Sequence, residues 1–95
     1  MILHYLYIIY SQTADKYYVG ETDDPEKRLQ EHIFHRYKKG FTKAAADWKL
    51  VLKFKTVNRE QAIYLEQFIK RMKSRKFIEK IIAQPAILDE ILLSK

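Results

Sequence analysis

The sequence predicts an α+β domain, in which a small, mainly antiparallel three-stranded sheet is flanked by helices in the order ββαβαα, with an extra C-terminal helix. Two runs rich in aromatic and β-branched residues, separated by the polar segment SQTADK, predict a hairpin. A later run alternates apolar residues with lysines, as a strand with one solvated side does. The other segments carry apolar residues at helical spacing. With 95 residues the chain has room for one domain, residues 1–95, around one small core.

Each strand is placed by its composition. The hairpin strands are expected over residues 3–10 and 17–20. The third strand is expected over residues 48–57, at or near a sheet edge, because its lysines give it a wet side. Together these three runs supply the predicted sheet.

The first helix is predicted over residues 22–39, with Asp24 as its N-cap and Pro25 at its first helical position. Gly40 closes this helix or the loop after it. The apolar residues that recur at helical spacing are Leu29, Ile33 and Tyr37.

The second helix is predicted to open at Asn58, which forms a capping box with Gln61. Ser74 then caps a short helix over residues 75–82, and Pro85 starts the last helix. The domain core is thus expected at about residues 4–82 and the C-terminal helix at about 84–93. The second helix has the inward stripe Ala62, Leu65, Ile69 and Met72, and the last helix has the apolar side Ile87, Leu88, Ile91 and Leu92.

The charge balance favours a polyanionic partner. The chain has 18 Lys+Arg against 12 Asp+Glu, a formal net charge of +6, and nucleic acid is the commonest partner of such a domain. Cysteine is absent, so neither disulfides nor thiolate metal sites are expected and a cytoplasmic location suits the chain. The apolar N-terminal run is too short for a membrane helix and lacks the marks of a signal peptide, so no membrane partner is expected.

Four short motifs in a fixed order point to a known family. They are YLY at residues 5–7, YVG at 18–20, EKRLQEH with Arg28 and His32, and AIYLEQFIK with Glu66 and Lys70. This ordered set resembles the GIY-YIG nuclease superfamily, above all its small single-domain bacterial members, which are related to the N-terminal nuclease domain of the excision-repair subunit UvrC. The resemblance covers about residues 4–82, and the first motif has Tyr5 where the family name has Gly.

The resemblance implies a metal-dependent endonuclease that hydrolyses DNA phosphodiester bonds, with a role in DNA repair or recombination. It implies one divalent ion, Mg²⁺ or Mn²⁺, held by Glu66, whose hard carboxylate oxygens suit such ions. The catalytic residues that it implies are Tyr7, Tyr18, Arg28, His32 and Glu66. A free tyrosine has a pKa near ~10, so a tyrosine base needs the metal or Arg28 to favour its phenolate.

Each of these residues also has a purely structural interpretation. Tyrosines are good strand residues, and alternation places Tyr7 and Tyr18 where a hairpin register brings them side by side. Arg28 is four residues from Asp24 and Glu66 is four from Lys70, so both can form ordinary helical ion pairs. His32 can be a satisfied core histidine.

Gly20 is expected to allow unusual backbone angles or the close approach of a ligand. It ends the second strand just before the first helix, so Tyr18 and Arg28 flank one junction. We therefore predict that Tyr7, Tyr18, Arg28 and Glu66 converge at one sheet surface.

Basic residues gather in two segments, 35–43 and 70–76. In the first, Tyr37, Phe41 and Gly40 are interleaved with the cations, which is typical of loops that contact nucleic acid phosphates. DNA, or RNA, is the expected ligand, and a protein partner is left open. The predicted nucleic-acid-binding residues are Arg36, Lys38, Lys39, Lys43, Lys70 and Lys73.

Other functions have weaker support. No phosphate loop, dinucleotide fingerprint or nucleophile elbow occurs, so no nucleotide cofactor is expected. The main alternative is a non-catalytic nucleic-acid-binding or assembly domain that retains the fold. A further alternative is a protein-interaction module that uses the C-terminal helix, provided that its apolar side is exposed.

Overall fold

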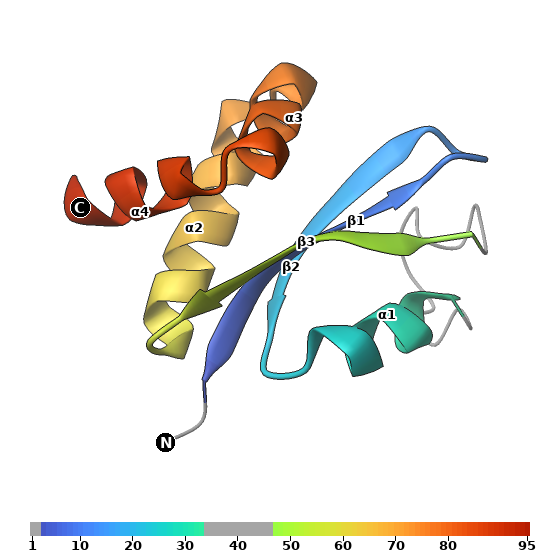
Figure 1. Cartoon of the computed structure of the whole chain (residues 1–95), viewed down its shortest axis with the longest axis horizontal. Coiled ribbons are helices and arrows are strands. Elements are labelled where there is room, and N and C mark those ends of the chain that lie inside the picture. The colour runs from blue at the N-terminus through green and yellow to red at the C-terminus, as the bar shows by residue number, and fades with distance from the viewer. Residues whose placement is uncertain (1–2, 34–46) are drawn as a thin grey trace.

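The structure is a computed structural model that describes residues 3–33 and 47–95. Within these residues the elements follow the order ββαβααα, as predicted (Figure 1). The strands are β1 (His4–Ser11), β2 (Lys16–Thr22) and β3 (Lys49–Thr56), and the helices are α1 (Pro25–Ile33), α2 (Arg59–Met72), α3 (Arg75–Ala83) and α4 (Ala86–Leu93). The fold class is thus the predicted α+β arrangement around a three-stranded antiparallel sheet.

The sheet has the order β2-β1-β3, with β1 in the centre and antiparallel to both neighbours. β3 is an edge strand, as its lysines predicted, and β2 forms the other edge. β2 runs to Thr22, two residues beyond the predicted end of the strand. Gly20 therefore lies inside β2, opposite Tyr7, while Tyr18 lies opposite Ile9.

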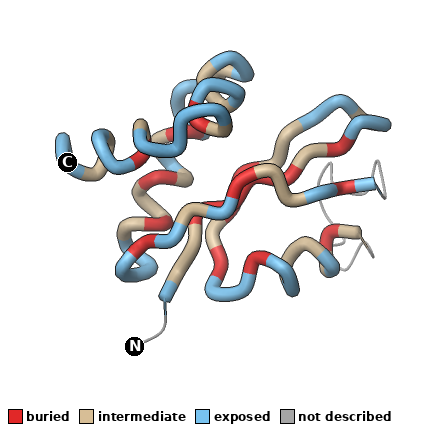
Figure 2. The backbone as a smooth tube through the Cα atoms, viewed as in Figure 1, coloured by how far each residue is buried: buried red, intermediate tan, exposed pale blue. Residues whose placement is uncertain are grey.

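The two faces of the sheet carry separate cores (Figures 1 and 2). Alternation along β1 directs Leu6 and Ile8 to the face covered by α2, α3 and α4, where Leu65, Ile69, Ile81 and Leu88 complete the larger cluster. The opposite face is covered by α1 and carries the smaller cluster of Tyr7, Ile9 and Trp48, against which Tyr18, Leu29 and Ile33 pack. The sheet thus separates two hydrophobic clusters, one on each face.

The predicted helix starts are present. The Lys27 backbone N–H donates to Asp24 Oδ1 at 3.1 Å, and the Gln61 N–H donates to Asn58 Oδ1 at 2.9 Å. Ser74 Oγ accepts from the Phe77 N–H at 3.1 Å. These caps satisfy amide donors that a helix leaves without intrahelical partners.

The prediction that Met72 belongs to the core is wrong. Met72 continues the helical stripe of α2 in sequence, but its side chain is 47% exposed. α2 ends at this residue, and Lys73 takes the left-handed conformation, with φ 48°. Met72 is therefore in the terminal turn of α2 and lies outside the cluster that buries Leu65 and Ile69.

Asp47 ties the start of β3 to the hairpin. Ser11 Oγ donates to Asp47 Oδ1 at 2.6 Å, and the backbone N–H and the hydroxyl of Thr13 donate to Oδ2 at 2.9 and 3.0 Å. The Ser11 bond first, and then the Thr13 bonds, lower the pKa of Asp47 to about 2. This carboxylate therefore connects two segments that are 36 residues apart in sequence.

Part of the prediction lies outside the described residues. This part comprises the extension of the first helix to Lys39, the apolar position Tyr37, the helix end at Gly40 and the basic segment 35–43, which includes Arg36, Lys38, Lys39 and Lys43. Among the described helices, none has the length and apolar character needed to cross a membrane.

Candidate active site

Tyr7 lies in the middle of the sheet, enclosed between β2 and α1. Its side chain is 1% exposed, and its hydroxyl oxygen lies 2.9 Å from His32 Nε2. Its ring passes directly over Gly20: a Cβ added to that glycine would lie 2.6 Å from the Tyr7 hydroxyl oxygen and 2.7 Å from the nearest ring carbons. The group that approaches Gly20 closely is thus the Tyr7 ring, which covers the glycine on the neighbouring strand.

His32 is buried in the last turn of α1. Burial, and then the positive charge of Arg28, lower the pKa of His32 to about 4, while the negative charge of Glu31 opposes this shift. The imidazole is therefore neutral at neutral pH, with one nitrogen that donates and one that accepts. In the tautomer that leaves Nε2 bare, the Tyr7 hydroxyl donates to it.

Tyr18 lies between residues of α1 and α2. Its ring centroid lies 4.6 Å from that of His32 and 6.4 Å from that of Tyr7. Lys70 Nζ lies 5.7 Å from the centroid of the same ring. Tyr18 is half-buried. Its ring lies beside His32 of α1 and Lys70 of α2 and is partly exposed to solvent.

Glu66 is the acidic residue of this group. Its Oε2 lies 2.8 Å from Lys70 Nζ, the helical ion pair that the spacing allowed, and its side chain is 20% exposed. Lys70 thus connects Glu66 to the Tyr18 ring. The carboxylate is fixed at the margin of the core and remains open to small ligands.

The Tyr18 ring and the Lys70–Glu66 pair come together at a sheet edge, and the expectation of a single sheet surface is wrong. Tyr7 and Tyr18 lie on the face covered by α1, whereas Glu66 belongs to α2, which packs on the opposite face. β2 is an edge strand, so Lys70 reaches the Tyr18 ring around the open side of the sheet. The candidate site therefore straddles the edge of β2.

Arg28 lies one helical turn before His32 and is half-buried. Its Nε lies 3.1 Å from Glu31 Oε1. Among the described residues the ion pair found is this one and not the alternative with Asp24, whose Oδ1 caps the helix. The charge of Arg28 nevertheless acts on His32, whose pKa it lowers. Arg28 therefore adds a cation to the α1 side of the site.

Glu66 fits a divalent cation that is shared with a substrate. Among the described residues, no group of three or more His, Cys, Asp or Glu side chains is positioned to hold a metal by itself. Glu66 supplies hard carboxylate oxygens close to the surface, and Mg²⁺ retains several waters and binds through one or two carboxylates together with substrate phosphates. Glu66 is the residue that would hold the ion.

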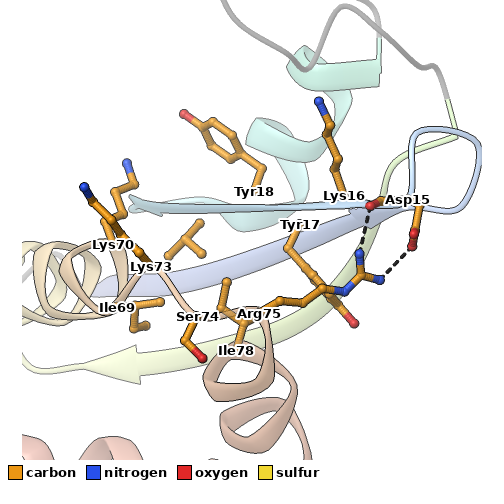
Figure 3. A pocket seen from close by; sticks show the side chains of 11 residues that line it. Asp15, Lys16, Tyr17, Tyr18, Ile69, Lys70, Lys73, Ser74, Arg75 and Ile78 are labelled. Atoms are coloured by element: carbon orange, nitrogen blue, oxygen red, sulfur yellow. Dashed lines mark hydrogen bonds and ion pairs between the residues drawn. The ribbon is translucent and has the colours of Figure 1, made fainter.

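A pocket beside Tyr18 escaped the sequence analysis. It has a volume of about 570 Å³ and lies between β2, the C-terminal end of α2 and the start of α3 (Figure 3). Lys70 and Lys73, both predicted to bind nucleic acid, contribute to its lining. No local signal predicts the pocket, because its walls come from a hairpin tip and a helix about 60 residues further along the chain.

Comparison with known proteins identifies the family of this chain. The model of the GIY-YIG catalytic domain matches residues 3–80. The solution NMR structure of the UPF0213 protein BH0048 from Bacillus halodurans is 25% identical, with a TM-score of 0.54 over 85% of this chain and 83% of that chain. A search of curated proteins found no match. Because the family model spans most of the chain, this chain belongs to the GIY-YIG nuclease superfamily.

Proposed function

We propose that this protein is a metal-dependent endonuclease that hydrolyses phosphodiester bonds in DNA. The observation that carries the proposal is the meeting of three elements at the Tyr18 ring: His32 from α1 lies on one side, and Lys70, paired with Glu66 of α2, approaches from the other. Membership of the nuclease superfamily supports the reaction class. A binding domain alone has no use for Glu66, whose negative charge repels phosphate when no metal is bound.

Tyr18 is the tyrosine that meets the attacking water. Tyr7 is enclosed, with 1% of its side chain exposed, whereas Tyr18 is half-buried and lines an open pocket. A general base must lie within hydrogen-bond reach of the proton it removes. With its phenolate form favoured by Arg28 or by the bound cation, Tyr18 therefore takes the proton of the water. Tyr7 positions the ring of His32 through the 2.9 Å bond.

His32 and Arg28 act on the α1 side. A neutral imidazole can accept a proton and pass it on, which a cationic one cannot do, and burial keeps His32 neutral. Arg28 contributes a planar cation with several donors, suited to the negative charge that builds on a phosphodiester oxygen.

On the α2 side, Glu66 holds the divalent cation and Lys70 contacts a phosphate of the strand. When bound, the cation supplies positive charge to the scissile phosphate and the leaving oxygen. Lys70 is paired with Glu66 at 2.8 Å before substrate arrives, and a phosphate offers it a replacement partner. We further propose that the reaction takes place in the cytoplasm, in DNA repair or recombination. The net charge of +6 supports a nucleic acid substrate, and the absence of cysteine supports the cytoplasmic location.

The Glu66→Gln variant tests this proposal. We expect it to lower the cleavage rate by about 100-fold or more, a loss typical of removing one charged group from a transition state, while binding to DNA is retained. The measurement is cleavage of labelled single-stranded, duplex and branched DNAs in Mg²⁺, Mn²⁺ or EDTA. Glu60→Gln, the same change at an exposed position in the first turn of the same helix, is the control.

Three outcomes contradict the proposal. Cleavage that persists in EDTA excludes the metal requirement. Equal losses in the Glu66 and Glu60 variants would show that the change acts through net charge alone. Tight, salt-sensitive binding without cleavage by the wild type would assign the protein to the non-catalytic nucleic-acid-binding class.

A further inference from the structure

The pocket beside Tyr18 combines an apolar floor with a cationic rim. Val19, Ile69 and Ile78 supply apolar surface from β2, α2 and α3. The labelled side chains in Figure 3 show Lys70 and Lys73 together at one end, and Arg75 joined to Asp15 at the other. A volume of about 570 Å³ is within the range of sites that enclose a small organic group.

Backbone strain is concentrated at this pocket. Among the described residues, two that are not glycine have positive φ: Asp15 at 52° and Lys73 at 48°. Both line the pocket. Lys73 occupies the left-handed position after α2, where glycine or asparagine is the usual residue. Residues held in such conformations cluster at active sites and ligand clamps, which makes the Lys73 side chain a candidate for function.

The cations at the two ends of the pocket differ in their ion pairs. Arg75 contacts Asp15 Oδ1 at 2.6 Å and Glu79 Oε2 at 3.4 Å, so its charge is committed to joining α3 to the hairpin. No ion pair involving Lys73 is found within the described part of the chain, and the residue is exposed. Lys73 is therefore the rim cation best placed to contact an anionic ligand.

We propose that this pocket receives an unpaired nucleotide of the strand being cut, next to the scissile phosphate. The inference rests on the proposed function and deepens it by naming single-stranded or branched DNA as the preferred substrate. The apolar floor, with Tyr17 on the same face of β2, suits the face of a base, and the rim lysines suit the flanking phosphates. Because Tyr18 and Lys70 belong to both the pocket and the candidate active site, the bound nucleotide is adjacent to the reacting phosphate.

Binding in EDTA tests the pocket without catalysis. Fluorescence anisotropy compares a labelled oligothymidine, the matching duplex, and an abasic strand of equal length that keeps every phosphate and lacks the bases. We expect wild-type protein to bind the abasic strand about tenfold more weakly than oligothymidine, as loss of a stacked base predicts. We also expect oligothymidine to bind more tightly than the duplex. Ile78→Trp, which fills the floor, should reduce the preference for bases and leave circular dichroism unchanged.

Lys73 provides a second test with an internal control. Lys73→Ala and Lys73→Gly both remove the cation, so both should weaken binding to oligothymidine. Both should also reduce the slope of the logarithm of the binding constant against the logarithm of the salt concentration by about one. Lys73→Gly should at the same time raise the melting temperature by a few degrees, because glycine adopts positive φ without strain. Lys76→Ala removes the same charge from an exposed site on α3 outside the pocket, and should weaken binding less.

The remaining outcomes overturn the inference. Equal binding of abasic and base-bearing strands excludes a base in the pocket. If Lys76→Ala weakens binding to oligothymidine as much as Lys73→Ala does, the lysines act through general electrostatic attraction and not through the pocket. If free thymidine monophosphate competes as strongly as oligothymidine, the site takes a free nucleotide instead of a strand. None of these results depends on cleavage, so they are separate from the Glu66 test.

Discussion

At the scale of single residues, the candidate site depends on one close packing contact. The Tyr7 ring lies over Gly20, and the same ring holds His32 through its hydroxyl. His32 in turn packs against Tyr18. A disturbance at Gly20 is therefore transmitted through Tyr7 to the residues that the proposal places around the substrate.

Gly20→Ala should destabilise the protein, because the new Cβ would lie 2.6 Å from the Tyr7 hydroxyl oxygen and the ring must move. Overpacking of this kind costs about 1–3 kcal/mol in the free energy of unfolding, which urea denaturation measures. The control is the same substitution in a Tyr7→Ala background, where the clash is absent and we expect a much smaller additional cost. Equal costs in the two backgrounds would disprove the coupling.

His32 should make stability depend on pH in a defined window. Its pKa is about 4 in the folded protein against an ordinary 6.5, so between these values the unfolded chain binds more protons. The contribution is fully present above about pH 6.5 and is lost as the pH falls towards 4; from pH 7 to pH 5 the loss is about 2 kcal/mol. Urea denaturation of wild type and His32→Gln at both pH values tests this, and parallel losses in the two proteins would refute it.

At the scale of elements, α4 belongs to the core of the domain. Leu88 is fully buried, and Ile87, Ile91 and Leu92 pack against the cluster formed by the sheet, α2 and α3. The apolar side of the helix is thus covered within the chain. This arrangement gives no support to an interaction module built on that side.

Leu88→Ala should therefore lower the free energy of unfolding by about 2–5 kcal/mol, the usual cost of emptying a fully buried leucine site. Thermal or urea denaturation measures the change. Leu93→Ala is a matched control on the same helix, because Leu93 is exposed, and it should be close to neutral. A harmless Leu88 variant would mean that α4 is detached from the core in solution.

Helix starts were predictable because caps are local. Asp24, Asn58 and Ser74 each accept a backbone N–H three residues ahead, so sequence spacing alone identifies them. The exposure of Met72 was not predictable in this way. Its burial depends on which residues of other elements reach the last turn of α2, and the helical period carries no information on that.

At the scale of the whole molecule, the sheet separates the two halves of the candidate site. The residues of α1 and those of α2 pack on opposite faces, and they come together because the order β2-β1-β3 leaves β2 at an edge. Alternation correctly placed Tyr7 and Tyr18 on one face. The meeting around the edge, and the pocket closed by Arg75 and Asp15, depend on contacts between residues about 60 positions apart, which no local pattern encodes.

The contact between Tyr7 and Gly20 also has a consequence for how such chains diverge. The glycine is needed because the ring on the next strand occupies the space of its side chain. Residues in direct contact tend to change together, so a relative with a smaller side chain at the first position is free to carry alanine at the second. We therefore expect an alignment of relatives to show the two positions varying as a pair.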